Sequence, residues 1–223
     1  MTRPGRVGSV SFTVRIYGLV PAAGRSERFG SAKLLAKWHD RELLGHVLLK
    51  LAGARAAGLL TGIVVVHRPD DDAVRDLALE YRGYPVAVRD PMGELSVSIR
   101  TGIEAIEQRG PPQQREALLI CHGDQPLLRL DVIHALADAW AHGGAVAARP
   151  AYRDTPGEPG LPMLVDRGLW KLAREMRGES GFAPVLESHR ITVRTIQVGG
   201  SNPDVDTPDD LARLEDTSTA AAG

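Results

Sequence analysis

A group of glycine, hydroxyl and cationic residues follows the first apolar run of the chain. Residues 19–35 read LVPAAGRSERFGSAKLL, which places Gly24, Arg25, Ser26, Arg28, Gly30 and Lys33 within ten positions. Glycines let backbone N–H groups approach an anion closely, and the N–H groups at a helix start add the positive end of a dipole. Cationic side chains neutralise phosphate oxygens. This stretch therefore predicts a strand that leads into a phosphate-binding loop.

The spacing of the glycines does not fit two well-known phosphate loops. The Walker loop requires a glycine, four residues and then Gly-Lys-Ser/Thr, whereas five residues separate Gly24 from Gly30, and Lys33 follows three positions later. The dinucleotide fingerprint requires Gly-x-Gly-x-x-Gly, which is absent here. The alternative to a third kind of phosphate loop is an ordinary strand-to-helix turn that carries arginines.

A candidate metal ligand lies in the sequence GDQP at residues 123–126, which directly follows the apolar run 117–121. A carboxylate at the end of a buried strand is well suited to hold a hard cation through oxygen. We therefore predict Asp124 as a metal ligand. A helix cap is the alternative, but Pro126 and residues 127–130 separate Asp124 from the next helical pattern.

The carboxyl-terminal stretch NPDVDTPDDLARL, residues 202–214, supplies further carboxylates. Thr207 can cap a helix and Pro208 can open it. Asp204 and Asp206 precede that helix, so at least one of them is free to face a site.

Other reactive residues receive plainer interpretations. Residues 70–72 are three aspartates, which we interpret as helix-start residues favoured by the helix dipole rather than as a metal site. Cys121 lies within an apolar strand and is interpreted as buried packing. His122 has no suitably placed carboxylate near it in the sequence, so we interpret it as a bystander near the site.

Apolar runs alternate with helical patterns in a way that predicts the fold. The predicted strands are residues 17–23, 63–66, 86–88, 117–121, 145–148 and 191–198, and the predicted helices are residues 41–59, 71–81, 99–106, 131–141, 169–176, 182–189 and 209–214. This order indicates an α/β fold with one doubly wound, mostly parallel sheet, whose ligands collect at the carboxyl ends of the strands. We expect a single domain over residues 16–215, flexible tails at 1–15 and 216–223, and a substrate-side flap at 152–160.

Composition narrows the function classes. The 223 residues carry a formal net charge of −1, which gives no electrostatic reason to expect nucleic acid or an anionic membrane as a partner. No apolar run approaches the length of a membrane span, and the start of the chain lacks the apolar core of a signal peptide. The single cysteine excludes an intrachain disulfide and a cysteine-based zinc site. We expect a cytoplasmic protein.

Four stretches occur in one order: AAGRSERFGSAK, GELSVSIRTG, GDQP and DVDTPDDL. As a set, spread over residues 19–214, they resemble the MobA-like nucleotidyltransferases, and most closely the molybdenum cofactor cytidylyltransferase branch. The resemblance implies a Rossmann-like fold and an Mg²⁺-dependent enzyme that transfers a nucleoside monophosphate to a phosphate-bearing acceptor such as molybdopterin. A client molybdoenzyme or its chaperone would then be a partner.

The resemblance also implies roles for individual residues. The implied nucleotide-binding residues are Ala22, Ala23, Gly24, Arg25, Ser26, Arg28, Lys33, Ser96, Ser98, Arg100 and Gly123, of which Ala22 to Gly24 act through their backbone. The implied catalytic residues are Arg28 and Lys33, which would bind the triphosphate, and Asp124. Asp124 and Asp206 would hold Mg²⁺. In this family Ala22-Ala23 favours CTP over GTP.

Two departures leave the acceptor open. Leu161 precedes Pro162 where the cytidylyltransferases carry a histidine, and Pro21 before Ala22 is similar to the isoprenoid-pathway cytidylyltransferases, whose His-Asp-Ala-Ala-Arg stretch is missing. The alternatives are therefore a nucleotidyltransferase for an isoprenoid precursor or a sugar phosphate, or a nucleotide-binding regulator without catalysis. A dehydrogenase-like domain is disfavoured by the missing glycine fingerprint.

Overall fold

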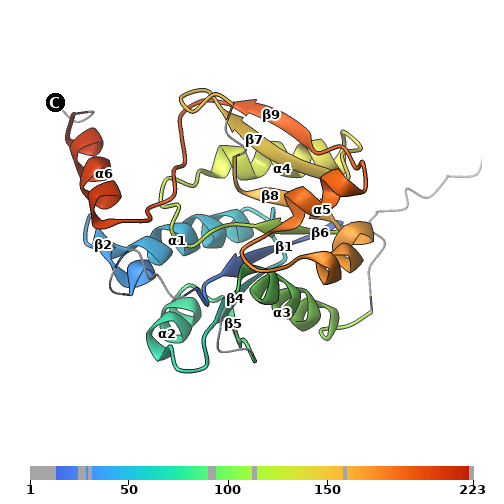
Figure 1. Cartoon of the computed structure of the whole chain (residues 1–223), viewed down its shortest axis with the longest axis horizontal. Helices are drawn as coiled ribbons and strands as arrows, with labels where there is room; N and C mark the ends of the chain where they lie inside the picture. The colour runs from blue at the N-terminus through green and yellow to red at the C-terminus, as the bar shows by residue number, and fades with distance from the viewer. Residues whose placement is uncertain are drawn as a thin grey trace, which may run out of the picture.

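A computed structural model describes residues 14–24, 29, 32–89, 94–111, 115–157 and 160–220, with side chains up to residue 214. Figure 1 shows a sheet at the centre of the molecule with helices on both sides. Arg25, Ser26 and Arg28, three of the predicted phosphate-binding residues, lie outside the described residues.

The described residues form one seven-stranded sheet in the order β5-β4-β1-β6-β8-β7-β9. Its strands are β1 (Val14–Pro21), β4 (Gly62–His67), β5 (Tyr84–Ala87), β6 (Arg115–Ile120), β7 (Ala147–Tyr152), β8 (Met163–Asp166) and β9 (Arg194–Val198). β1 pairs in parallel with β4 and β6, β4 with β5, and β7 with β9, while β8 runs antiparallel between β6 and β7. The predicted α/β fold with a mostly parallel sheet is confirmed.

The helices cover both faces of this sheet, as the doubly wound prediction requires. They are α1 (Leu43–Ala56), α2 (Asp72–Glu80), α3 (Leu95–Glu107), α4 (Leu130–Ala141), α5 (Phe182–Ser188) and α6 (Pro208–Ala220), with the 3₁₀ helices η2 (Lys33–Leu35) and η3 (Arg167–Glu175). One apolar core joins the sheet to α1, α2 and α4, and a second joins it to α3, η3 and α5.

The central strands feed both cores because their side chains alternate between faces. In β4, Ile63 and Val65 pack in the first core, whereas Val64 and Val66 pack in the second. A wholly apolar β-branched run is therefore required here, as the sequence predicted. Glycine at position 102 lets α3 lie close to β1, since a Cβ there would be 2.2 Å from Leu19 Cδ1.

Three local predictions need correction. The predicted helix over 41–59 begins only at Leu43, because Arg41–Glu42 forms β3 and pairs with β2 (Lys37–Trp38). The strand predicted at 145–148 begins at Ala147 and continues to Tyr152. The stretch after the predicted flap, for which no strand was predicted, is β8, which pairs antiparallel with β6 and β7 through contacts that no local pattern encodes. No described helix has both the length and the apolar character needed to cross a membrane.

Candidate functional site

The site lies where β1 and β6 end side by side. Beyond β1, the Ala22 N–H donates to the Val66 carbonyl at 2.7 Å, and beyond β6 the Cys121 N–H donates to the Leu19 carbonyl at 2.9 Å. The loops that follow both strands therefore leave the same edge of the sheet. Ala22 and Ala23 are buried while Gly24 is exposed, so the chain emerges into solvent at the start of the predicted phosphate loop.

Three predicted site residues meet at this edge. The Lys33 ammonium donates to Asp124 Oδ2 at 2.5 Å and to Asp206 Oδ1 at 3.0 Å. Burial by itself would lower the pKa of Lys33, but the two carboxylates outweigh it and the net shift is upward. Lys33 therefore stays cationic at neutral pH, and one positive charge lies between two negative ones.

The helix start of α6 positions Asp206. The Thr207 hydroxyl accepts a hydrogen bond from the Asp210 N–H at 3.2 Å, which confirms the predicted cap. In return Asp210 Oδ2 accepts from the N–H groups of Asp206 at 3.1 Å and of Thr207 at 2.8 Å. This role of Asp210 was not predicted, although the T-x-x-D spacing of a capping box indicates it.

A backbone contact joins this segment to the aspartate loop after β6. The Val205 N–H donates to the Asp124 carbonyl at 3.0 Å. Asn202 reinforces the junction, because its side-chain amide donates to Gln125 Oε1 at 3.3 Å and its carbonyl accepts from Gln125 Nε2 at 3.2 Å. The loop that carries Asp124 and the segment that carries Asp206 are therefore bound to each other, which fixes the relative position of the two predicted metal ligands.

His122 has a carboxylate beside it after all. Its Nδ1 lies 3.9 Å from Asp204 Oδ1, a carboxylate that the fold, and not the local sequence, places next to this histidine. Burial alone would lower the pKa of His122, yet Asp204 and Asp124 produce a net rise. Desolvation by itself would raise the pKa of the Asp204 carboxyl, whose side chain is 50% exposed, but His122 and Lys33 lower this pKa overall. The partner is remote in sequence, which is why local inspection missed it.

The aspartates suit a divalent cation. Asp124 Oδ1 is buried and accepts no hydrogen bond from the described part of the chain. Among the described residues, His122, Asp124 and Asp204 form a group of potential ligands whose atoms lie within 4.8 Å of one another. Carboxylate oxygens are ligands that Mg²⁺ and Mn²⁺ accept readily. The residues present therefore fit a metal-binding function.

The comparison with protein families is decisive at this point, because a model described as the MobA-like NTP transferase domain matches residues 18–193. The chain belongs to the MobA-like NTP transferase family. The match includes the predicted phosphate loop, Lys33 and Asp124, and it ends before Asp206. The expected family and its Rossmann-like nucleotidyltransferase fold are thereby confirmed.

Individual relatives differ in what they are named for. Bifunctional protein GlmU of Kineococcus radiotolerans is 33% identical over 187 residues, which cover 81% of this chain and 34% of that protein. The chain thus matches only about a third of that relative's length. The 2-C-methyl-D-erythritol 4-phosphate cytidylyltransferase of Acidithiobacillus ferrooxidans is 31% identical over 169 residues, covering 70% of this chain and 69% of that protein.

Solved structures agree with the fold. Rv0371c of Mycobacterium tuberculosis H37Rv superposes with a TM-score of 0.73 at 28% identity, covering 91% of this chain and 98% of that one. The same protein was also solved in complex with manganese, and that structure has a TM-score of 0.72 at 27% identity, covering 91% of this chain and 99% of that one. A protein similar to this MobA-like chain has therefore been solved with manganese bound.

The serines of the second motif lie inside α3 of this MobA-like chain rather than ahead of it. Ser96 and Ser98 are in the first turn, both buried, and their hydroxyls have no hydrogen-bond partner among the described residues. The Arg100 guanidinium donates to the Met176 carbonyl at 3.0 Å and the Ala173 carbonyl at 3.5 Å. Arg100 is therefore engaged with η3 and does not join Lys33 and the carboxylates.

Gly123 has a packing role at the edge of the site. A Cβ at this position would lie 3.1 Å from Leu34 Cδ2 and 3.2 Å from Leu44 Cδ1. Glycine therefore lets η2, which begins at Lys33, approach the aspartate loop. The role of Gly123 in nucleotide binding stays a prediction.

A cavity of about 380 Å³ opens beside Lys33 and the end of β1, and Ala22, Gly24 and Arg68 also line it. Arg68 follows β4 and donates to Asp70 at 2.9 Å and 3.1 Å. Arg68 was not predicted as a site residue, because nothing in the sequence distinguishes it beyond its place after a strand. Asp71 caps α2 by accepting from the Val74 N–H at 3.1 Å, as interpreted.

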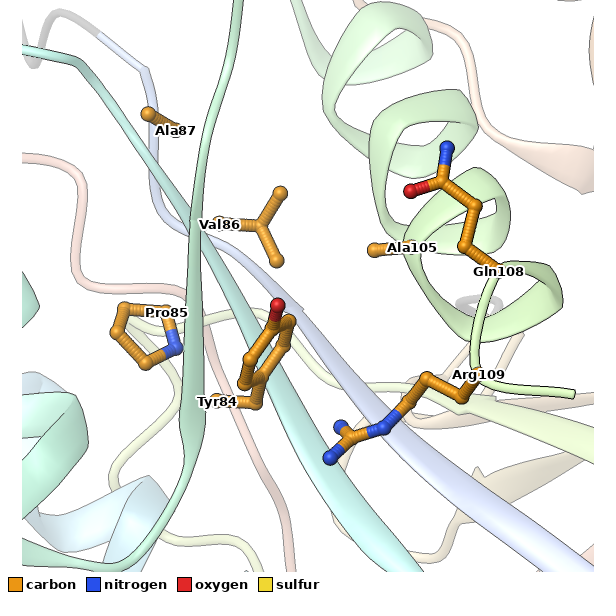
Figure 2. Close-up of a pocket in the computed structure, with 7 residues that line it drawn as sticks. All are labelled: Tyr84, Pro85, Val86, Ala87, Ala105, Gln108 and Arg109. Carbon is orange, nitrogen blue, oxygen red and sulfur yellow. The ribbon is translucent and has the colours of Figure 1, made fainter.

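A second, larger cavity of about 480 Å³ lies between the edge strand β5 and α3. Figure 2 shows Tyr84 and Arg109 at one end of it and Gln108 at the other. None of the described residues that line it is a carboxylate, and the Arg109 guanidinium is 4.4 Å from the centre of the Tyr84 ring. This cavity lacks the charge pattern of the site beside Lys33.

Proposed function

We propose that the chain is an Mg²⁺-dependent nucleotidyltransferase that transfers CMP from CTP to a phosphate-bearing acceptor, with molybdopterin as the preferred candidate, and releases pyrophosphate. The observation that carries the proposal is the single ammonium of Lys33 between Asp124 and Asp206, at the carboxyl ends of neighbouring strands. Transfer of a phosphate-containing group needs positioning and charge neutralisation more than a protein nucleophile.

In the proposed reaction an oxygen of the acceptor phosphate attacks the α-phosphorus of the nucleoside triphosphate in line. A new P–O bond forms to the acceptor, and the bond to the β-phosphate oxygen breaks so that pyrophosphate leaves. The backbone of Ala22 to Gly24 lines the base and ribose. Lys33 and Arg28 neutralise the negative charge that grows on the leaving pyrophosphate.

Asp124 and Asp206 would hold the Mg²⁺, which when bound supplies positive charge to the phosphate oxygens. In the described structure the ammonium of Lys33 contacts both carboxylates. With Mg²⁺ held by these carboxylates, the Lys33 ammonium would be released from them and would contact the triphosphate. Ser96, Ser98 and Gly123 remain candidates for nucleotide contacts, and the buried hydroxyls of the two serines have no hydrogen-bond partner among the described residues.

Cys121 takes no part in the proposed chemistry. It is buried, and burial raises the pKa of its thiol, so the thiolate that a nucleophile requires is disfavoured. The reaction as proposed needs no protein nucleophile, and the carboxylates and cations at the strand ends are sufficient for it.

The identity of the acceptor is less constrained than the identity of the nucleotide. Leu161 stands where a histidine is usual, and its carbonyl accepts hydrogen bonds from the Tyr152 hydroxyl at 2.8 Å and from Asn202 at 3.5 Å. A second candidate is therefore a sugar or sugar-alcohol phosphate. The likeness to the 2-C-methyl-D-erythritol 4-phosphate cytidylyltransferase favours it, as does Pro21 before Ala22.

Pyrophosphate release tests both candidates. The protein is incubated with Mg²⁺ and each of CTP, GTP, ATP and UTP, alone and with molybdopterin or 2-C-methyl-D-erythritol 4-phosphate. We expect release with CTP only when molybdopterin is present, and release with the other acceptor would support the second candidate. Asp124→Asn should lower the rate by about 100-fold or more while the fold is kept.

Three results would count against the proposal. A near-normal rate in Asp124→Asn would remove the assigned metal ligand. Tight CTP binding without pyrophosphate release on any acceptor would indicate a nucleotide-binding regulator. Tight NAD binding without binding of any nucleoside triphosphate would indicate a different α/β class.

A further inference from the structure

Lys33 donates to only one of the two carboxylate oxygens of Asp124. Its Oδ2 accepts from the Lys33 ammonium at 2.5 Å, whereas Oδ1 is buried and has no hydrogen-bond donor in the described part of the chain. A buried, charged oxygen without a partner is costly, so the surroundings of Oδ1 are expected to supply a cation or a donor.

His122 and Asp204 lie close to this carboxylate. One potential ligand atom from each of His122, Asp124 and Asp204 falls within 4.8 Å of the other two. Ligand atoms of one divalent cation lie about 2.0–2.6 Å from it, so two of them are at most about 5 Å apart. His122 Nδ1 is 3.9 Å from Asp204 Oδ1, which is longer than a hydrogen bond. The three side chains can therefore reach a common ion with little rearrangement.

The fold brings these side chains together in two short segments that bind each other. His122 and Asp124 flank Gly123 in the loop after β6, and Asp204 lies in the segment before α6. The hydrogen bond from Val205 to the Asp124 carbonyl fixes one segment against the other next to all three ligand residues. Asp206, at the far end of the second segment, is paired with Lys33 instead.

We propose that His122 is a direct ligand of the divalent cation held by Asp124, with Asp204 as a further ligand. This inference rests on the proposed function, because it adds ligands to the metal site of that reaction. An imidazole nitrogen suits Mn²⁺ and the later transition metals, whereas Mg²⁺ is held by oxygen ligands. The chain is therefore expected to bind Mn²⁺ more tightly than Mg²⁺.

The test uses the full chain with the metal alone. Pulsed electron paramagnetic resonance of the Mn²⁺ complex detects a directly bound imidazole nitrogen, and calorimetric titration gives the Mn²⁺ and Mg²⁺ affinities. We expect a nitrogen signal in the wild type that His122→Gln abolishes. The variant should bind Mn²⁺ about 10-fold more weakly or worse, with a smaller change for Mg²⁺.

A matched control is available on α4. His134 also pairs with an aspartate, Asp138, at 3.0 Å, but both side chains are exposed and lie outside the site. His134→Gln should leave the nitrogen signal and both affinities unchanged.

A wild-type Mn²⁺ complex without a nitrogen signal would overturn the inference, and this result does not depend on whether a variant folds. Equal Mn²⁺ affinity in the wild type and His122→Gln would overturn it as well. Neither measurement involves nucleotide. CTP-dependent transfer without a nitrogen signal would thus contradict only this inference, whereas a nitrogen signal in a protein that transfers no nucleotide would support it and count against the proposed function.

Discussion

At the residue scale, the ammonium of Lys33 forms ion pairs with two carboxylates at once, and its side chain is only 12% exposed. An ammonium in this position offsets the repulsion between Asp124 and Asp206, which would otherwise be close like charges. Lys33 therefore contributes to stability in the absence of metal and to phosphate binding in the proposed reaction. A substitution at this position separates the two contributions.

We predict that Lys33→Met lowers the free energy of unfolding by about 1–3 kcal/mol in the presence of a chelator. This is less than the ~3–5 kcal/mol for breaking a fully buried pair, because the Asp206 side chain is 33% exposed. Mg²⁺ should raise the melting temperature of the variant more than that of the wild type, because a cation takes the place of the ammonium. Thermal melting with chelator and with Mg²⁺ measures both effects.

The exposed Lys171 on η3 provides the control, and Lys171→Met should change neither the stability nor the response to metal. Lys33→Met should also lose CTP-dependent turnover by about 100-fold or more if the lysine acts on the triphosphate. A variant whose melting temperature responded to Mg²⁺ no more than the wild type would contradict the view that metal and lysine compete for the carboxylates.

At the element scale, two contacts show how neighbouring elements pack: α3 against β1, and β7 against the segment before β8. The first depends on a glycine in a helix, since α3 packs on β1 through Gly102. The second depends on a buried phenol, since Tyr152 ends β7 and donates to the Leu161 carbonyl. Each contact leads to a stability prediction.

Gly102→Ala should destabilise the protein by about 1–2 kcal/mol. The new Cβ would meet Leu19 Cδ1 at 2.2 Å, in a fully buried side chain that has little room to move. The steric cost of this contact exceeds the ~1 kcal/mol that alanine gains over glycine in a helix, so the net effect is destabilising. Gly53→Ala in α1 is the matched control, because its Cβ would contact Leu130 at an ordinary 3.6 Å.

Chemical denaturation of the two variants tests this explanation. Gly53→Ala should be neutral or more stable than the wild type, and adding Leu19→Val to Gly102→Ala should recover part of the loss. If Gly102→Ala proved as stable as Gly53→Ala, close packing of α3 on β1 would not be the reason for glycine at position 102.

Tyr152→Phe should make the free energy of unfolding fall less steeply at alkaline pH than it does in the wild type. Burial raises the pKa of Tyr152 to about 12, from an ordinary value of 10.0. The folded state therefore holds the phenol proton more tightly than the unfolded state, so this stability is complete below pH 10 and is lost as the pH rises through about 12. Urea unfolding of both proteins between pH 8 and 12 measures the difference.

The variant should be less stable than the wild type by about 1 kcal/mol at pH 8, because the hydrogen bond to Leu161 is gone. The gap should narrow as the pH rises. A gap that stays constant up to pH 12 would show that the Tyr152 phenol does not titrate differently in the two states.

At the scale of the whole molecule, most of the sheet was predictable because each central strand is an apolar run with its own signal. Residues 63–66 had to be buried on both faces, and the two cores of the structure explain why. β8 was missed as a strand, since its position between β6 and β7 depends on antiparallel pairing across long stretches of chain. The phosphate loop, Asp124 and Asp206 were predicted from motifs that combine residue type with local position.

The sequence by itself determined the family, most of the order of the elements and the residue types of the candidate site, because apolar periodicity, turn residues and motifs act over short distances along the chain. Only the tertiary structure decided which side chains meet. Lys33 reaches Asp124 across 91 positions and Asp206 across 173, and His122 finds Asp204 in a segment that lies next to β6 only in the folded chain. The physical reason is that the strand order and the pairing of loops at one edge of the sheet fix these distances, and neither is a local property of the chain.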